Sequence, residues 1–357
     1  MVELTGKMKP AKDRNDALPV AGALLAALFF GVSTPLSKPL TSSLDAFTLA
    51  GLLYLGAGLG LAALEPFRRS AAVPAGRRPN YRYIAGMIVC GGLLGPVFLM
   101  LAIKRAPAAS VAIWLNMELV ATALLGWLFF KDHLHARGWA SAAITLAAGL
   151  MLSYDGGAAG LAAGSLTALA CLCWGLDNHF TALIDDLPPA RSTMIKGLAA
   201  GPVNLLVGLA LAGWALPPAA PAVKALLVGF VSYGLSITLY IASAQRLGAV
   251  RSQLAFSTAP VFGVSLSVLL LGEGLSAVQV ISGVLLFGSV LLMLSEKHSH
   301  AHAHAAMEHS HSHTHDDMHH GHSHYGEEEG AHAHFHKHEP GEHEHPHWPD
   351  LHHRHGH

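Results

Sequence analysis

The chain has 357 residues, of which only 13% are charged, and its mean hydropathy is +0.41. A soluble domain carries roughly 25% charged residues, so this composition excludes a soluble globular protein and indicates one embedded in lipid. The formal net charge of −1, with no basic stripe along the chain, excludes nucleic acid as a partner.

Nearly all of the charges lie in the N-terminal segment 1–17, in short spacers and after Glu296. Between them, apolar runs of about 20 residues, the length that crosses roughly 30 Å of hydrocarbon, occur ten times. The sequence therefore predicts an all-α membrane protein with ten transmembrane helices. They cover Leu18–Ser37, Phe47–Leu64, Tyr83–Ile103, Ala108–Phe130, Gly138–Tyr154, Gly160–Ile184, Thr193–Trp214, Ala225–Gln245, Ser252–Leu271 and Ala277–Leu294.

The distribution of Lys and Arg predicts how these spans are oriented. An even number of spans places both termini on one side, and that side collects most of the cations, including the run from Arg68 to Arg82 and also Lys196. Cationic loops resist translocation, so this side is the cytoplasm. We expect a multi-pass protein of the bacterial inner membrane with both termini cytoplasmic. The other side holds only Lys38, Lys104, Arg105 and Lys224.

The hydrophobic region divides into two halves, residues 18–154 and 160–295, and the alignment of one with the other predicts an internal repeat. With a constant offset of 141 residues, the segment that starts at Met117 aligns with the ninth span, and Asp132 lies opposite Glu273. Each half contains five predicted helices. Because five is odd, equivalent helices cross the membrane in opposite directions, which defines an inverted repeat.

These features together resemble the EamA type of the drug/metabolite transporter superfamily. They are the two five-helix halves, the aromatic-Gly pairs Phe30-Gly31 and Trp174-Gly175, and the acids Asp132 and Glu273. The second span lacks the arginine that is frequent in such proteins. The resemblance implies a secondary active transporter, usually an exporter of small organic solutes such as amino acids, with a central cavity and no required cofactor.

Several polar residues at membrane depth are candidates for the substrate cavity. Glu118 lies near the middle of the fourth span, where an unpaired carboxylate costs on the order of 3 kcal/mol. It could bind a substrate amine, couple protons or form a structural hydrogen bond. Trp114 lies one turn earlier and could line the cavity or only pack. We include both residues among the candidates.

The sixth span adds Asp177, Asn178 and His179, and its counterpart in the first span adds Ser33 and Thr34. Symmetry-related polar positions are where such repeats place substrates. Asp177 and His179 are two residues apart, so they do not share one helix face. Each could equally make a structural contact between helices.

The tail, residues 298–357, contains 23 of the 26 histidines, many in H-x-H alternation. It has almost no aliphatic residues, so we expect it to be disordered and to bind a divalent metal ion such as Zn, Ni, Co or Cu. A solvated tail without a biological role in metal binding is the alternative. The candidate ligands are His298, His300, His302, His304, His309, His311, His313, His315, His319, His320, His322 and His324.

The sequence gives no indication of an enzyme. Residues 343–347 match H-E-x-x-H, but Pro346 prevents the helix that this motif requires. Two functions remain: an exporter of a small organic metabolite with a metal-binding tail, or an exporter of a divalent metal or metal chelate collected by that tail. The expected partners are the lipid bilayer, a small-molecule solute, divalent metal ions and, in a homodimer, a second copy of the chain.

Overall fold

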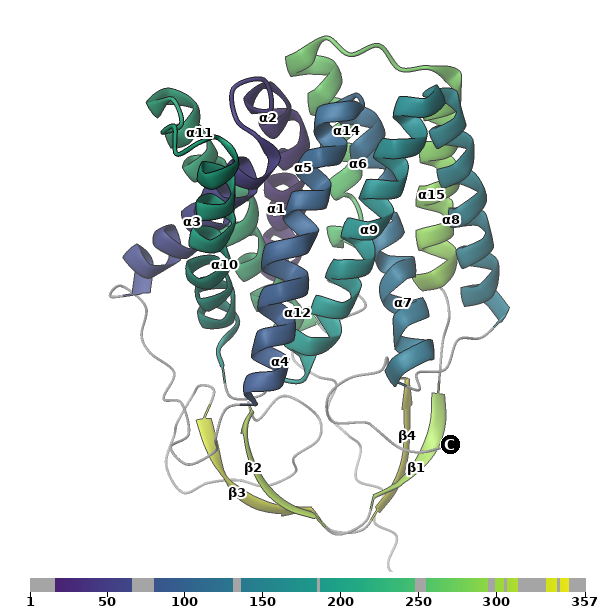
Figure 1. Ribbon diagram of the computed structural model, residues 1–357. Coiled ribbons are helices and arrows are strands. Elements are labelled where there is room, and N and C mark those ends of the chain that lie inside the picture. Colours follow the sequence, from purple (N-terminus) through teal and green to yellow (C-terminus); the bar gives the residue numbers. More distant parts are fainter. Residues whose placement is uncertain are drawn as a thin grey trace, which may run out of the picture.

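A computed structural model describes residues 17–65, 80–130, 136–184, 187–247, 255–294, 299–304, 307–313, 332–338 and 341–346. Its helices form one bundle, and four strands lie beyond the bundle end where α4 begins and α7 ends (Figure 1). The helices are α1 (Ala17–Gly31), α2 (Ser33–Leu40), α3 (Ala46–Leu64), α4 (Tyr81–Gly86), α5 (Gly95–Arg105), α6 (Ala108–Trp114), α7 (Met117–Phe130), α8 (Ala136–Asp155), α9 (Gly157–Ala182), α10 (Pro189–Leu211), α11 (Ala219–Gly229), α12 (Ser236–Leu247), α14 (Ala259–Leu271) and α15 (Ala277–Leu294).

These helices occupy the ten predicted spans. Within the described residues, seven continuous segments are long and apolar enough to cross a membrane, and α14 and the apolar part of α15 are shorter. The seven correspond to the first four spans and to spans six, seven and eight. The structure thus supports a multi-pass helical membrane protein, and the count of ten spans stays a prediction.

Four of the predicted spans are interrupted. The first is divided at Val32 into α1 and α2, and the fourth at Leu115 and Asn116 into α6 and α7. In the third and eighth, π-helical stretches over Met87–Leu94 and Phe230–Leu235 connect α4 to α5 and α11 to α12. A π-helical turn leaves the ordinary α-helical hydrogen-bond register, and such turns are frequent at functional sites.

Backbone carbonyl groups of the first π-helical stretch accept hydrogen bonds from side chains of other helices. Pro96 has no N–H, so it cannot donate to the carbonyl oxygen of Gly92. Asn204 on α10 donates instead, with its Nδ2 at 3.2 Å from the carbonyl oxygens of both Gly92 and Leu93. The Gly91 carbonyl accepts from the Tyr54 hydroxyl at 2.6 Å and from Trp174 Nε1 at 3.2 Å. Helices α3, α9 and α10 are therefore joined at this stretch.

Helices of the two halves interlock closely. Helix α10 packs along α3, and glycine makes the close approach possible because a Cβ on Gly197 would lie 2.5 Å from the carbonyl oxygen of Tyr54. A Cβ on Gly201 would lie 2.6 Å from the amide nitrogen of Leu55. Small residues at such contacts are how membrane helices associate. The halves therefore form one packed body.

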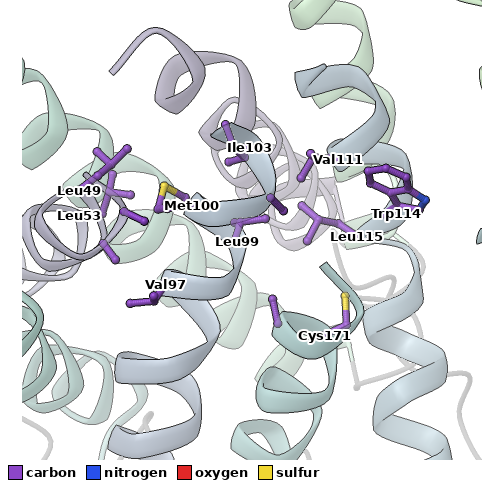
Figure 2. Close-up of a cluster of buried hydrophobic side chains, with 14 of the residues drawn as sticks. Leu49, Leu53, Val97, Leu99, Met100, Ile103, Val111, Trp114, Leu115 and Cys171 are labelled. Atoms are coloured by element: carbon purple, nitrogen blue, oxygen red, sulfur yellow. The ribbon is translucent and has the colours of Figure 1, made fainter. Parts of the chain in front are cut away.

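Part of the apolar core lies where α3, α5, α6 and α9 meet. Figure 2 shows this cluster, with Leu49 and Leu53 on α3 and Met100 on α5. Side chains such as these are almost completely buried. The core fixes the helices that carry the polar residues described below.

The sequence predicted a disordered tail, whereas the structure contains four strands in it. Strand β1 (Ser299–His304) pairs with β4 (Gly341–Pro346), and β2 (Met307–His313) pairs with β3 (His332–His338), both antiparallel. The H-x-H alternation has the two-residue period of a β-strand, which explains the difference.

Candidate functional site

Charged and polar side chains converge where α7, α9, α10 and the first π-helical stretch meet. The central contact is an ion pair between Asp177 on α9 and Lys196 on α10. The Lys196 ammonium donates to both carboxylate oxygens, at 2.7 and 2.5 Å, and the Thr181 hydroxyl donates to one of them at 3.2 Å. Both charged side chains are buried, with 10% exposed.

The glycines of the π-helical stretch make room for this ion pair. A Cβ at Gly91 would collide with the Asp177 carboxylate, and a Cβ at Gly92 would lie 3.1 Å from Cγ of Lys196. Burying a charged pair costs free energy unless each partner is well satisfied. The geometry meets that condition, because bidentate contact and the Thr181 hydroxyl saturate much of the Asp177 carboxylate.

Glu118 lies in the first turn of α7, directly after the break in the fourth span. Asn178 Nδ2 donates to Glu118 Oε1 at 3.3 Å and contacts the Thr122 hydroxyl at 3.2 Å. His179 Nε2 lies 2.9 Å from the carbonyl oxygen of Thr122. The start of a helix favours a negative charge, so the break after α6 helps to stabilise this carboxylate at membrane depth.

The ion pair and Glu118 lie close enough to interact electrostatically. We name the three residues Glu118, Asp177 and Lys196 the central charge cluster. Glu118 interacts electrostatically with both members of the ion pair. With all three groups ionised, the cluster contains two negative charges and one positive charge. Lys196 neutralises Asp177 by direct contact, so the Glu118 carboxylate is left with one neutral hydrogen-bond donor, Asn178, on its side chain among the contacts described. The cluster is therefore suited to receive one more cation.

The structure brings together four of the predicted cavity residues, Glu118, Asp177, Asn178 and His179. Trp114 is 1% exposed, belongs to the apolar cluster in Figure 2 and donates to the Gly149 carbonyl at 3.3 Å, and its place in the substrate cavity stays a prediction. Ser33 and Thr34 are buried at the start of α2.

Lys196 is a candidate site residue whose position the sequence alone predicted wrongly. It was grouped with the cytoplasmic cations that orient the chain, whereas the structure buries it inside α10 against Asp177. Two features of the sequence could have indicated a buried lysine: Lys196 lies within the predicted span Thr193–Trp214, and the preceding span contains the acid Asp177.

A second polar group, at the start of α6, joins the halves. Glu273, just after α14, accepts hydrogen bonds from the amides of Ala108 and Ala109 at 2.8 and 2.9 Å. Lys38 donates to the carbonyl oxygens of Ile103 and Ala106 at 2.7 and 2.8 Å, near the end of α5. Glu273 therefore caps α6 across the two halves. Its predicted counterpart, Asp132, lies outside the described residues.

The metal ligands predicted in the tail divide into two sets. Within the described part of the chain, no three His, Cys, Asp or Glu residues gather as a metal site. His300, His302, His304, His309, His311 and His313 lie in β1 and β2. His298, His315, His319, His320, His322 and His324 lie outside the described residues.

The helical part of the chain is similar to known proteins. Residues 18–154 and 162–295 each match the profile of the EamA-like transporter family. An uncharacterized transporter of Methanothermobacter thermautotrophicus is 23% identical over 291 residues, which cover 76% of this chain and 84% of that protein. A solved crystal structure has a related fold with a TM-score of 0.57 and 17% identity, and it covers 77% of this chain and 98% of its own. The tail lies outside both family matches.

Proposed function

Since the chain belongs to the EamA-like transporter family, we propose that this membrane transporter exports a small organic metabolite bearing an amine in exchange for protons. The observation that carries the proposal is the central charge cluster, in which, among the residues that the structure describes, Glu118 and Asp177 face one cation, Lys196. An uncompensated carboxylate at membrane depth costs on the order of 3 kcal/mol, so the cluster favours either a proton or a cationic substrate group.

Competition at Glu118 provides a mechanism for exchange. A proton and a substrate ammonium each neutralise the same carboxylate, so binding of one disfavours binding of the other. Asn178 on α9 donates a hydrogen bond to Oε1 of Glu118 on α7. Because α7 belongs to the first half and α9 to the second, this bond orients the carboxylate at the contact between the two halves. If the halves move relative to each other in alternating access, the site carries either a proton or an amine across the membrane.

The test is a flux assay with the purified full chain in liposomes that contain a pH-sensitive dye. With an imposed pH gradient, added primary amines are expected to drive proton movement, whereas alcohols of matched size are not. A series of alkylamines, aromatic amines and basic amino acids would define the substrate. Transport of a solute without a cationic group, or amine transport without proton movement, would contradict the proposal.

For the membrane arrangement, we propose ten spans in two inverted five-helix halves, in a bacterial inner membrane with both termini in the cytoplasm. Two successive matches to one family profile and the cation-rich run from Arg68 to Arg82 support this arrangement. A fluorescent reporter that matures only in the cytoplasm, fused after His357, should become fluorescent. A periplasmic reporter that is active at the same position would contradict the orientation.

A second candidate function is export of a divalent metal or metal chelate, and the histidine-rich tail favours it. In that case zinc or nickel would stimulate flux in the same liposomes, and removal of residues 298–357 would lower the metal-dependent flux. The charge of the cluster argues for the organic substrate, because one ammonium neutralises its net charge of −1, whereas a divalent cation would leave a net positive charge beside Lys196. The predicted homodimer stays a prediction.

A further inference from the structure

Five buried side-chain hydroxyls make no hydrogen bond of good geometry with any residue that the structure describes. They belong to Ser33, Ser37, Ser232, Tyr233 and Ser282, and each of these residues is at most 2% exposed. Burying a hydroxyl without a hydrogen bond is unfavourable, so such groups indicate a bound water or ligand. Four of the five lie on α2 and on the second π-helical stretch.

The two serines of α2 differ from other serines on the helices. A serine on a helix commonly donates to a carbonyl group of the preceding turn. Ser153 and Ser267 do so, at 2.7 and 2.8 Å from the carbonyl oxygens four residues earlier. Ser33 and Ser37 make no such bond. Because they are four residues apart, they lie on one face of α2, about 6 Å apart along its axis.

Tyr233 connects this face of α2 to the central charge cluster. Its hydroxyl lies close to that of Ser33 and interacts electrostatically with Glu118. The Tyr233 ring packs edge-on against Phe30, with ring centroids 6.0 Å apart, and tilted against Tyr54 at 5.4 Å. These contacts fix the ring, so the hydroxyl oxygen has a fixed position near both Ser33 and the cluster.

The serine face of α2 also reaches the end of the bundle opposite the tail strands. Ser37 lies in the last turn of α2, which ends at Leu40 (Figure 1). Thr41, four residues beyond Ser37, is partly exposed, and Ser42 and Ser43 are exposed. In the proposed orientation this end faces the periplasm. The hydroxyls therefore form a series from the outer surface toward the central charge cluster.

We propose that Ser37, Ser33 and Tyr233 hold a chain of hydrogen-bonded water molecules that conducts protons between the outer surface and Glu118. One water bridges two hydroxyls about 6 Å apart, since it makes two hydrogen bonds of about 2.8 Å. In each step an oxygen accepts a proton on one side and releases one on the other. One proton thus arrives at the Glu118 carboxylate, and no other group changes its charge. The inference rests on the proposed proton exchange and supplies its route.

The decisive experiment removes single hydroxyls and measures two kinds of flux in the same liposomes. In Ser33→Ala, Ser37→Ala and Tyr233→Phe, the initial rate of amine-driven proton movement is expected to fall about tenfold, as for a barrier raised by one lost hydrogen bond. Exchange of radiolabelled amine for unlabelled amine needs no proton transfer, so its rate should be unchanged. The probe is the primary amine that gives the fastest flux in the liposome assay.

Ser282→Ala is the matched control, because it removes a buried hydroxyl that also lacks a described partner, but on α15, which packs mainly against α8. Its proton flux should equal that of the unaltered protein. Unchanged proton flux in the three path variants, or an equal loss in Ser282→Ala, would overturn the path. A parallel loss of amine exchange would overturn it as well, because the hydroxyls would then act in substrate movement. Failure of the proposed function would appear in the unaltered protein, as amine exchange without proton movement, and would overturn both proposals.

Discussion

Replacing Lys196 with methionine is expected to destabilise the protein by about 3–5 kcal/mol, because the Asp177 carboxylate would then be buried without its cation. Methionine approximates the length of the lysine stem, so the change removes mainly the charge. Thermal unfolding of the detergent-solubilised protein, followed by tryptophan fluorescence, is the measurement. The double variant Lys196→Met with Asp177→Asn should recover much of the lost stability, since it removes both charges.

Lys224→Met is the matched control, because Lys224 is exposed on α11. Its stability should stay within about 0.5 kcal/mol of the unaltered protein. An unfolding temperature for Lys196→Met equal to that of Lys224→Met would mean that the ion pair contributes nothing to the fold. If the double variant is stable but inactive, the ion pair is needed for transport as well as for stability.

Glu118→Gln is expected to abolish amine-driven proton flux while the protein stays folded. Glutamine keeps the shape of the side chain and can still bond with Asn178, but it can neither release a proton nor bind an ammonium ion as a carboxylate does. A hydrogen bond to a charged group is worth about 1.5–3 kcal/mol, so amine binding should weaken roughly 10- to 100-fold. Substrate binding in detergent at several pH values tests this.

In the unaltered protein, acidification should weaken amine binding because protons compete for Glu118. In Glu118→Gln this dependence should disappear. Glu65→Gln is the control, since Glu65 lies at the end of α3 beside Arg191, with 43% of its side chain exposed. Full proton-coupled flux in Glu118→Gln would limit Glu118 to a structural role.

The helical architecture could be predicted because hydrocarbon thickness dictates how long each apolar run must be. The breaks within spans could not be predicted, because their stability comes from partners far along the chain. The Gly91 carbonyl, for example, is satisfied by Tyr54 and Trp174, and no local pattern identifies those donors. Pro96 interrupts the hydrogen bonding of an α-helix, but a proline alone does not specify a π-helical stretch.

The candidate site was predictable only in part for a related reason. Carboxylates such as Glu118 and Asp177 stand out within apolar runs, so they were identified. Lys196 occurs near a helix end, where lysine ordinarily extends to the aqueous interface, and only its contact with Asp177 on α9 in the folded structure reveals that it is buried. The spacing of Asp177 and His179 correctly separated them: Asp177 bonds with Lys196, whereas His179 contacts Thr122.

The close packing of α3 on α10 has a consequence for biosynthesis. Helix α3 ends at residue 64 and α10 begins at residue 189, so 125 positions separate them. At 5–20 residues per second, the ribosome needs roughly 6–25 s to cover that distance. During this interval α3 lies in the membrane without its packing partner. The nascent first half is thus a potential substrate for membrane proteases and chaperones until α10 emerges, and pauses in translation between these helices would lengthen that exposure.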